Sequence, residues 1–214
     1  SGGEPHSEEA FRSMSEAGVK TIISVDGANP NLALAKRYGM RYVHLPIGYD
    51  TIEPERALEL GRAIRDLEGP IYVHCHHGKH RGPAAAAVAL IAAENWSNEE
   101  ALAFIRQAGT SQKDAGLYEV VESFQLESSD ALDAASAEFP EVADRSDMVQ
   151  GMAAMDRHFD NLALAAAENF GVPRDHPDID PQHEARQLYE RLREVLRRSA
   201  AWRGDMPQGM RDGE

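Results

Sequence analysis

Short apolar runs alternate with amphipathic stretches over the first half of the chain. Three runs rich in β-branched or aromatic residues predict strands, at residues 21–25, 42–45 and 71–74. Before and between them, the apolar spacing of three and four predicts helices over residues 7–17, 30–38 and 54–67. Asn29 is positioned to cap the second helix, with Pro30 at its first position.

This alternation defines the expected fold class. Strands separated by helices of this length form right-handed crossover units, so we expect an α/β fold with a central, mostly parallel sheet flanked by helices. Ligands of such sheets bind beyond the carboxyl ends of the strands. Cys75 follows the third predicted strand and Gly48-Tyr49-Asp50 follows the second. The topology therefore predicts that both segments lie on one rim.

The second half of the chain has helical periodicity almost throughout. Ser97 and Glu100 form a capping box for one helix, and further helices are expected over residues 115–124, 148–170 and 185–199. The polar segment 128–147 is expected to connect them, with one short helix. We therefore expect two parts, a catalytic domain over residues 1–126 and a helical extension over residues 127–214, whose helical hairpin packs on the domain or on a partner such as a second copy.

Charge narrows the class of partner. The net charge is −14 and the sequence pI about 5.0, which argues against nucleic acid or an anionic membrane as the main partner. No apolar run approaches the ~20 residues that span a bilayer. Positive charge gathers in one place, because Lys79, Arg81 and four of the nine histidines lie between residues 74 and 81. The sequence therefore predicts a local site for an anionic, phosphorylated substrate.

The chain has one cysteine, Cys75, so no disulfide can form within it. A lone cysteine is either an inert buried side chain or a reactive one, and its neighbours decide between them. No signal peptide is visible, and the compartment stays open between the cytoplasm and export.

The residues that follow Cys75 form a pattern that suits the binding of an anion. A strand is followed by Cys-x5-Arg with Gly78 inside it, and Gly82-Pro83 then opens an Ala-rich helix. A loop that leads into a helix N-terminus points several backbone N–H groups at one spot, where the helix dipole favours an anion. Arg81 offers a planar fork to two phosphate oxygens. The same field stabilises the thiolate of Cys75 as a nucleophile.

Two other interpretations of this loop carry less weight. Cys75 could be a structural residue in a loop that happens to be basic. The histidines around it could hold a metal, although adjacent residues of a sharp loop rarely converge on one tetrahedral ion. We expect no metal and no other cofactor. His74 is better explained as a group that hydrogen-bonds the loop backbone and supports the thiolate.

The segment His74-Cys75-x5-Arg81 resembles the signature of the protein tyrosine and dual-specificity phosphatase superfamily, with similarity from about Gly2 to Phe124. The resemblance implies a cysteine-phosphatase fold, a phosphocysteine intermediate on Cys75, and phosphate bound by Arg81 and the loop. Gly78-Lys79-His80-Arg81 is similar to small atypical dual-specificity enzymes that act on inositol pyrophosphates. The substrate-binding residues are then His76, His77, Gly78, Lys79, His80 and Gly82.

One position departs from the family. The residue after the arginine is usually Ser or Thr, whose hydroxyl supports the departing thiolate when the intermediate breaks down. Here it is Gly82. This difference predicts slow hydrolysis of the phosphoenzyme, or a substitute donor such as His74, His77 or His80.

Transfer from a poor leaving group needs a proton donor on a nearby loop. Asp50 is the best candidate, with Glu53 and Glu55 as alternatives. The competing interpretation of Asp50 is a helix or turn cap. Asp26 lies on the same rim, where we expect it to act as a turn residue in Asp26-Gly27.

Three functions remain under comparison. The first is a phosphatase that hydrolyses phosphomonoesters of proteins (phosphotyrosine or phosphoserine) or of inositol phosphates. The second is a rhodanese-like sulfurtransferase, which also uses a cysteine in an anion-binding loop. The third is a non-catalytic phosphate-binding module, which Gly82 makes plausible. The order of strand, cysteine loop and Asp50 favours the phosphatase.

Overall fold

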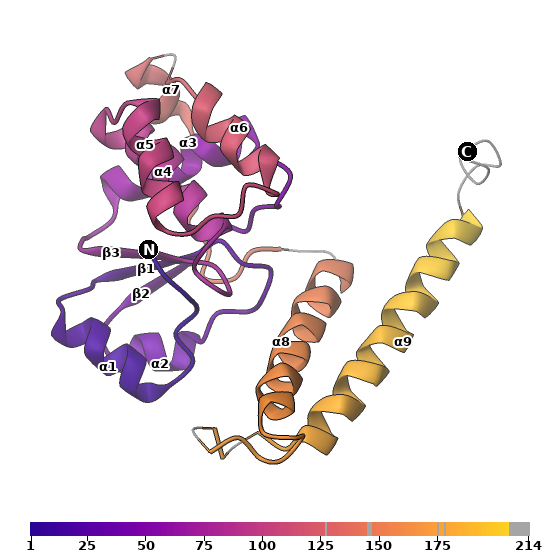
Figure 1. Ribbon diagram of the computed structural model, residues 1–214. Coiled ribbons are helices and arrows are strands. Elements are labelled where there is room, and N and C mark those ends of the chain that lie inside the picture. Colours follow the sequence, from indigo (N-terminus) through magenta and orange to yellow (C-terminus); the bar gives the residue numbers. More distant parts are fainter. Residues whose placement is uncertain (127, 145–146, 175, 178, 206–214) are drawn as a thin grey trace. The chain divides into compact units, whose positions relative to one another are not determined.

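The computed structural model of the chain describes residues 1–126, 128–144, 147–174, 176–177 and 179–205. It divides into two compact units, Ser1–Ala143 and Asp144–Glu214. The first unit holds the sheet and the cysteine loop, and the second is helical (Figure 1).

The sheet of the first unit is parallel and small. Its strands are β1 (Thr21–Ser24), β2 (Arg41–His44) and β3 (Ile71–His74), in the order β2-β1-β3. Ser24 is in register with both His44 and His74, so all three strands end at one edge. The segments that follow them, with Asp26, Pro46 and Cys75, therefore leave from the same rim.

Helices cover both faces of this sheet (Figure 1). One face packs against α1 (Glu8–Glu16) and α2 (Leu32–Arg37), around buried Phe11, Ile22 and Tyr42. The other face is covered by α3 (Pro54–Asp66), α4 (Arg81–Glu94), α5 (Asn98–Gln107), α6 (Ala115–Ser123) and α7 (Ser129–Ala134). The predicted parallel α/β class is confirmed.

The Ala-rich helix α4 lies at the centre of the larger core. Eleven of its residues are buried, and α4 packs on β3, α3, α5 and α6. A helix of small residues allows these neighbours to approach closely. The start of α4, where the phosphate loop ends, is thereby held on several sides.

Sequence signals for helix ends were mostly correct. The capping box of Ser97 and Glu100 is present, and Pro54 begins α3. The start of α2 was predicted wrongly: it begins at Leu32, and its cap is Asn31, whose Oδ1 accepts a hydrogen bond from Leu34 N at 3.2 Å. Both asparagines are suitable caps, and the turn from Pro30 O to Leu32 N takes up the earlier residues.

The first residues of the chain run along the outer edge of β3. Gly2 forms a parallel bridge with His74, and Gly2 N donates to Val73 O at 3.1 Å. Glu4 N donates to His76 O at 3.0 Å, and the Tyr72 hydroxyl donates to Gly3 O at 2.9 Å. Residues 2–4 are thus bonded to β3 and to the cysteine loop, which the sequence pattern did not predict.

The first unit extends beyond residue 126, the end predicted for the catalytic domain. Its last segment returns to the sheet, where His44 N donates to Pro140 O at 2.8 Å. Arg62 of α3 donates to the carbonyl oxygens of Asp133 and Ala135 at the end of α7. These bonds attach residues 129–143 to the first unit.

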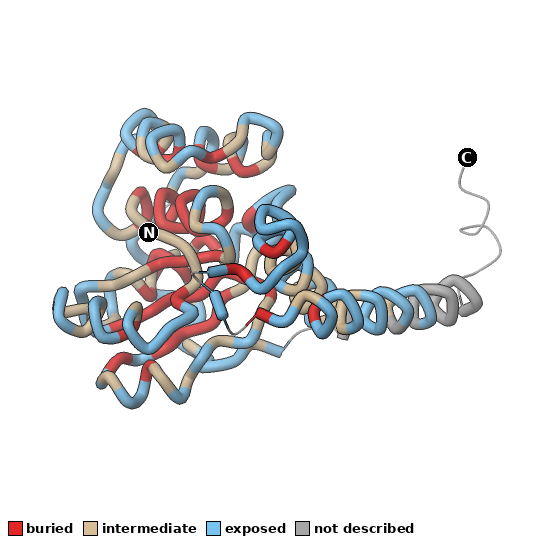
Figure 2. The backbone as a smooth tube through the Cα atoms, turned by 60° about the horizontal axis from the view of Figure 1, so that its bottom comes forward, coloured by how far each residue is buried: buried red, intermediate tan, exposed pale blue. Residues whose placement is uncertain are grey.

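The second unit consists of α8 (Asp147–Ala167) and α9 (Pro181–Asp205), which pack on each other as a hairpin. His158 Nδ1 and Glu184 Oε2 are 2.6 Å apart and join the two helices. The side chains of Met148 and Ser199, which belong to the predicted apolar stripes, lie outside the described part. Most of the described residues of α9 are exposed and are pale blue in Figure 2.

Among the residues that the structure describes, no helix combines the length and apolar character needed to cross a membrane.

Candidate active site

The cysteine loop connects β3 to α4, as expected. Cys75 follows the last residue of β3 and is 2% exposed. The helix begins at Arg81, one residue before the predicted Gly82-Pro83 start, with His80 at the N-cap position. The loop backbone therefore curls around the N-terminal end of a 14-residue helix, where N–H groups and the helix dipole favour an anion.

Gly78 gives the loop its curvature. Its φ is +74°, a left-handed conformation that favours glycine. A side chain here would also clash with the backbone of Gly2 and Gly3. The loop and the N-terminal segment thus fit together backbone to backbone.

Arg81 is held between two other groups. Its Nη2 donates to Asp26 Oδ2 at 3.4 Å, and its Cζ lies 4.4 Å from the ring centroid of Tyr49. Arg81 is 8% exposed, and its buried Nε has no hydrogen-bond partner among the described residues. A buried donor without an acceptor is costly, and an anion bound in the loop would supply one.

Asp26 has more than the turn role predicted for it. Its Oδ1 accepts from Ala28 N at 2.9 Å, as a turn residue would, while Oδ2 faces Arg81. The carbonyl oxygen of Asp26 contacts His44 Nε2 at 2.7 Å. Asp26 is 4% exposed, so its charge is compensated mainly by the buried guanidinium. Its place on this rim was predicted, and its pairing with Arg81 was not.

His74 is buried beneath the loop and is neutral near pH 7. Burial lowers the pKa of His74 to about 4. Its Nδ1 lies 3.3 Å from Cys75 O and its Nε2 lies 2.6 Å from the Tyr42 hydroxyl. A carbonyl can only accept, so Nδ1 carries the proton and donates to it, and Nε2 accepts from Tyr42. Burial also raises the pKa of Tyr42, which keeps that hydroxyl protonated.

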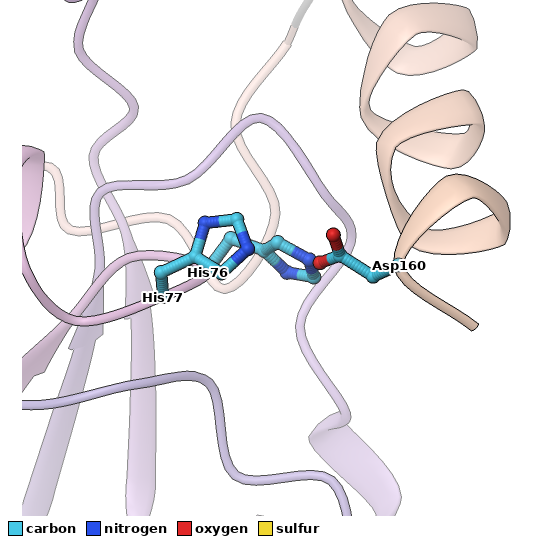
Figure 3. Close-up of side chains that lie close together, drawn as sticks. All are labelled: His76, His77 and Asp160. Atoms are coloured by element: carbon cyan, nitrogen blue, oxygen red, sulfur yellow. The ribbon is translucent and has the colours of Figure 1, made fainter. Parts of the chain in front are cut away.

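The remaining loop residues differ in their surroundings. His76 Nδ1 lies 3.3 Å from Glu4 Oε2, and the rings of His76 and His77 are 4.6 Å apart at 71° (Figure 3).

The exposed Lys79 is fixed through its backbone, because Thr110 donates its hydroxyl proton to Lys79 O at 2.7 Å. His80 Nδ1 lies 3.7 Å from Asp114 Oδ2. Glu4, Thr110 and Asp114 were not predicted to belong to this site, because no motif in the sequence links them to the loop.

Gly82 is buried directly behind the nucleophile. A Cβ at this position would lie 3.0 Å from Cys75 N and 3.3 Å from the carbonyl carbon of His74. A serine or threonine could enter only if the loop moved by a few tenths of an ångström. The absence of the usual hydroxyl therefore coincides with a close approach of backbone to backbone.

Asp50 lies on the exposed loop that follows β2. Its Oδ1 folds back over Gly48, where a Cβ would clash with it, and its carbonyl oxygen rests against Gly116 of α6. Asp50 does not cap α3, since Glu53 occupies the N-cap position. Both Glu53 and Glu55 are exposed at the start of that helix. Tyr49 thus brings this loop to Arg81, while the Asp50 carboxylate faces its own loop.

Known proteins resemble this chain in sequence over part of its length. No family model matches it. Over 98 residues the chain is 29% identical to the dual specificity protein phosphatase TpbA of Pseudomonas aeruginosa strain UCBPP-PA14, which covers 45% of this chain and 44% of that protein. TpbA of a second strain is 28% identical over 98 residues. The chain matches less than half the length of these curated relatives.

Solved structures resemble it in fold. The crystal structure of P. aeruginosa TpbA has a TM-score of 0.50 at 22% identity and covers 60% of this chain and 80% of that one. A cysteine-to-serine form of TpbA in complex with pTyr has a TM-score of 0.51 at 21% identity, with coverages of 64% and 85%. The chain therefore has the cysteine-phosphatase fold, and the predicted resemblance to the tyrosine and dual-specificity phosphatase superfamily is confirmed.

Proposed function

We propose that the chain is a phosphatase that hydrolyses phosphomonoesters through a phosphocysteine intermediate on Cys75. The observation that carries the proposal is the anion cradle around that residue. Cys75 is buried at the N-terminal end of α4, and the buried Nε of Arg81 has no acceptor among the described residues. A phosphoryl group would supply that acceptor and neutralise the guanidinium.

In this proposal Cys75 attacks phosphorus and Arg81 binds two oxygens of the phosphoryl group. His76, His77, Gly78, Lys79, His80 and Gly82 complete the substrate site. Neutral His74 donates to the Cys75 carbonyl and fixes the shape of the loop. Asp50 delivers the proton to the leaving group after its side chain turns from Gly48 toward the loop, for which the exposed position leaves room.

Phosphotyrosine is one substrate class to test, because a relative was crystallised with pTyr. Inositol phosphates are the other, because Lys79 adds a cation and His80 adds a hydrogen-bonding ring beside the first phosphate site. A phosphatase is favoured over sulfur transfer, since the relatives are named as phosphatases. A binding module without catalysis is the remaining alternative.

The test is turnover of p-nitrophenyl phosphate, followed by a panel of phosphotyrosine peptides and inositol phosphates. Cys75→Ser should abolish turnover while phosphate still binds. The matched control is Ser13→Ala on the outer side of α1, which should leave turnover unchanged. Equal phosphate binding by wild type and Cys75→Ser with no turnover by either would establish the binding module instead. Thiosulfate turnover without phosphatase activity would establish the sulfurtransferase.

We also propose that the α8–α9 hairpin joins two copies of the chain. Apolar side chains are exposed on both helices, with Phe159 at 61%, Tyr189 at 59% and Leu196 at 55%. Two helices cannot cover both of their apolar faces alone, and a second hairpin would complete a four-helix bundle. Light scattering should give a dimer mass, and Phe159→Glu with Leu196→Glu should give a monomer. A monomer before substitution would reject the proposal.

A further inference from the structure

The structure separates the histidines of the cysteine loop by what surrounds them. His74 is buried, with Tyr42 and the Cys75 carbonyl at its two nitrogens. His76 lies on the side of the N-terminal segment, near Glu4. His80 lies directly before Arg81 and has other neighbours, with its ring centroid 6.1 Å from that of Tyr49 and its Nδ1 3.7 Å from Asp114 Oδ2. Of these residues, His80 is therefore the one that lies between α6 and the loop that carries Tyr49 and Asp50.

The partner of His80 is an unusual carboxylate. Asp114 occupies the N-cap position of α6 yet makes no capping hydrogen bond with its side chain. Its Oδ2 is buried, has no hydrogen-bond partner among the described residues, and lies 3.7 Å from His80 Nδ1. A buried carboxylate oxygen is costly unless a cation lies beside it. The aspartate thus gives up its ordinary structural role and faces the imidazole.

The segment that carries Asp114 is attached to the cysteine loop. Thr110 donates its hydroxyl proton to Lys79 O at 2.7 Å, and Tyr118 donates to Thr110 O at 2.9 Å. These bonds flank Asp114 on both sides in sequence. They hold its carboxylate at a constant place relative to the residue that follows Lys79, which is His80.

We propose that His80 is the base that activates water when the phosphocysteine is hydrolysed, and that Asp114 is the residue that positions it. This inference rests on the proposed phosphatase function and deepens it. Residue 82 lacks the hydroxyl that usually assists this step, and the close approach there admits no side chain unless the loop shifts. His80 with Asp114 supplies the missing assistance from the other end of the loop.

His80 Nε2 takes a proton from water while the water oxygen forms a bond to phosphorus. The P–S bond breaks, and its electron pair returns to Cys75 Sγ as the thiolate. Asp114 compensates the charge that His80 gains, as a carboxylate does in an imidazole–carboxylate pair. Inorganic phosphate leaves, and His80 releases the proton to solvent. Asp50 is the acid of the earlier step, in which the phosphoryl group is transferred to Cys75.

The two steps can be measured separately. With p-nitrophenyl phosphate the first step releases nitrophenol and needs little acid assistance, because nitrophenolate is a good leaving group. Rapid mixing gives the rate of the nitrophenol burst, steady state gives kcat, and acid quench with intact mass spectrometry gives the phosphoenzyme fraction. The variants are His80→Gln and Asp114→Asn, with the exposed His183→Gln of α9 as the matched control.

We expect His80→Gln to keep the burst rate and to lower kcat about 100-fold, within the usual range for a general base. Most of the variant should accumulate as phosphoenzyme. Asp114→Asn should lower kcat about tenfold in the same way, and the double variant should match His80→Gln, since both residues act in one step. Imidazole in the buffer should partly restore kcat of His80→Ala. The control should behave as wild type.

Three results would overturn the inference. One is a slower burst in His80→Gln without phosphoenzyme, which would make His80 a residue for substrate binding. Another is an unchanged kcat. The third is additive losses in the double variant, which would separate Asp114 from His80. Failure of the proposed function looks different, because no form, wild type included, would then release nitrophenol or carry phosphate on Cys75.

Discussion

Nη2 of Arg81 lies 3.4 Å from Oδ2 of Asp26, and both side chains are at most 10% exposed. The pair joins Asp26, two positions beyond the end of β1, to the first residue of α4. The carboxylate thereby orients a guanidinium whose Nε points to no partner in the described structure.

Asp26→Asn should weaken phosphate binding. The amide keeps the shape of the side chain but removes the charge that orients Arg81. We expect the inhibition constant of inorganic phosphate to rise on the order of tenfold, equivalent to about 1.4 kcal/mol. The control is Asp133→Asn, which loses an exposed pair with Arg65. Equal inhibition constants in wild type and Asp26→Asn would show that Arg81 is held without Asp26.

The buried His74 should make stability depend on pH. Burial lowers the pKa of His74 to about 4, whereas the unfolded chain has about 6.5. The unfolded state thus binds this proton first, and the free energy of unfolding falls as pH drops from about 6.5 to about 4. The whole contribution is about 3 kcal/mol. Below pH 4 both states are protonated, and no more is lost.

Urea denaturation of wild type and His74→Asn at a series of pH values measures this loss. The difference between their free energies of unfolding should shrink as pH falls through that window. The exposed His183→Asn should parallel wild type. A difference that does not vary with pH would mean that His74 binds a proton as readily in the folded state as in the unfolded chain.

Two substitutions at Gly82 distinguish the effect of an added Cβ from the effect of an added hydroxyl. Gly82→Ala places a Cβ 3.0 Å from Cys75 N, so the loop must shift and phosphate should bind more weakly. Gly82→Ser makes the same contact and adds the hydroxyl found in the family. We expect the Gly82→Ser variant to hydrolyse its phosphoenzyme several-fold faster than the Gly82→Ala variant, with a similar affinity for phosphate. Equal rates would show that a hydroxyl has no use at this position.

Gly78→Ala should destabilise the protein by more than the cost of its conformation. An L-residue in the left-handed region costs about 1–2 kcal/mol, and here the methyl group also meets the Gly2–Gly3 backbone. Gly39→Ala is the control, because its φ of +70° is similar and an added Cβ would have no described atom beyond its chain neighbours within 4 Å. Thermal unfolding should rank Gly78→Ala well below Gly39→Ala. Equal melting temperatures would show that the N-terminal segment moves away.

The sequence predicted those parts of the site that are contiguous. Cys75, Gly78 and Arg81 belong to one loop, and the strand before it and the helix after it have clear periodicity. The parallel sheet followed from the same alternation. Each of these features depends on neighbours along the chain, which a single sequence contains.

Pairs between distant segments could not be predicted. Tyr42 and His74 are 32 residues apart, and Asp26 and Arg81 are 55 apart. Each residue alone has a simpler explanation: Tyr42 is a buried residue of a strand, and Asp26 is a turn residue. The bridge between Gly2 and His74 gave no signal either, because a segment with two glycines lacks the apolar pattern of a strand. Register and packing create these contacts.

The contact between Gly116 and the Asp50 carbonyl limits the movement of the loop that carries Tyr49 and Asp50. Backbone meets backbone at that point, so the loop cannot advance toward α6. Any displacement of the loop must leave this contact unchanged or lengthen it. A one-sided range of this kind acts as a mechanical stop, and the size of residue 116 would set where the stop lies. Enlarging that residue would push the loop away from α6 without replacing any group of the proposed chemistry.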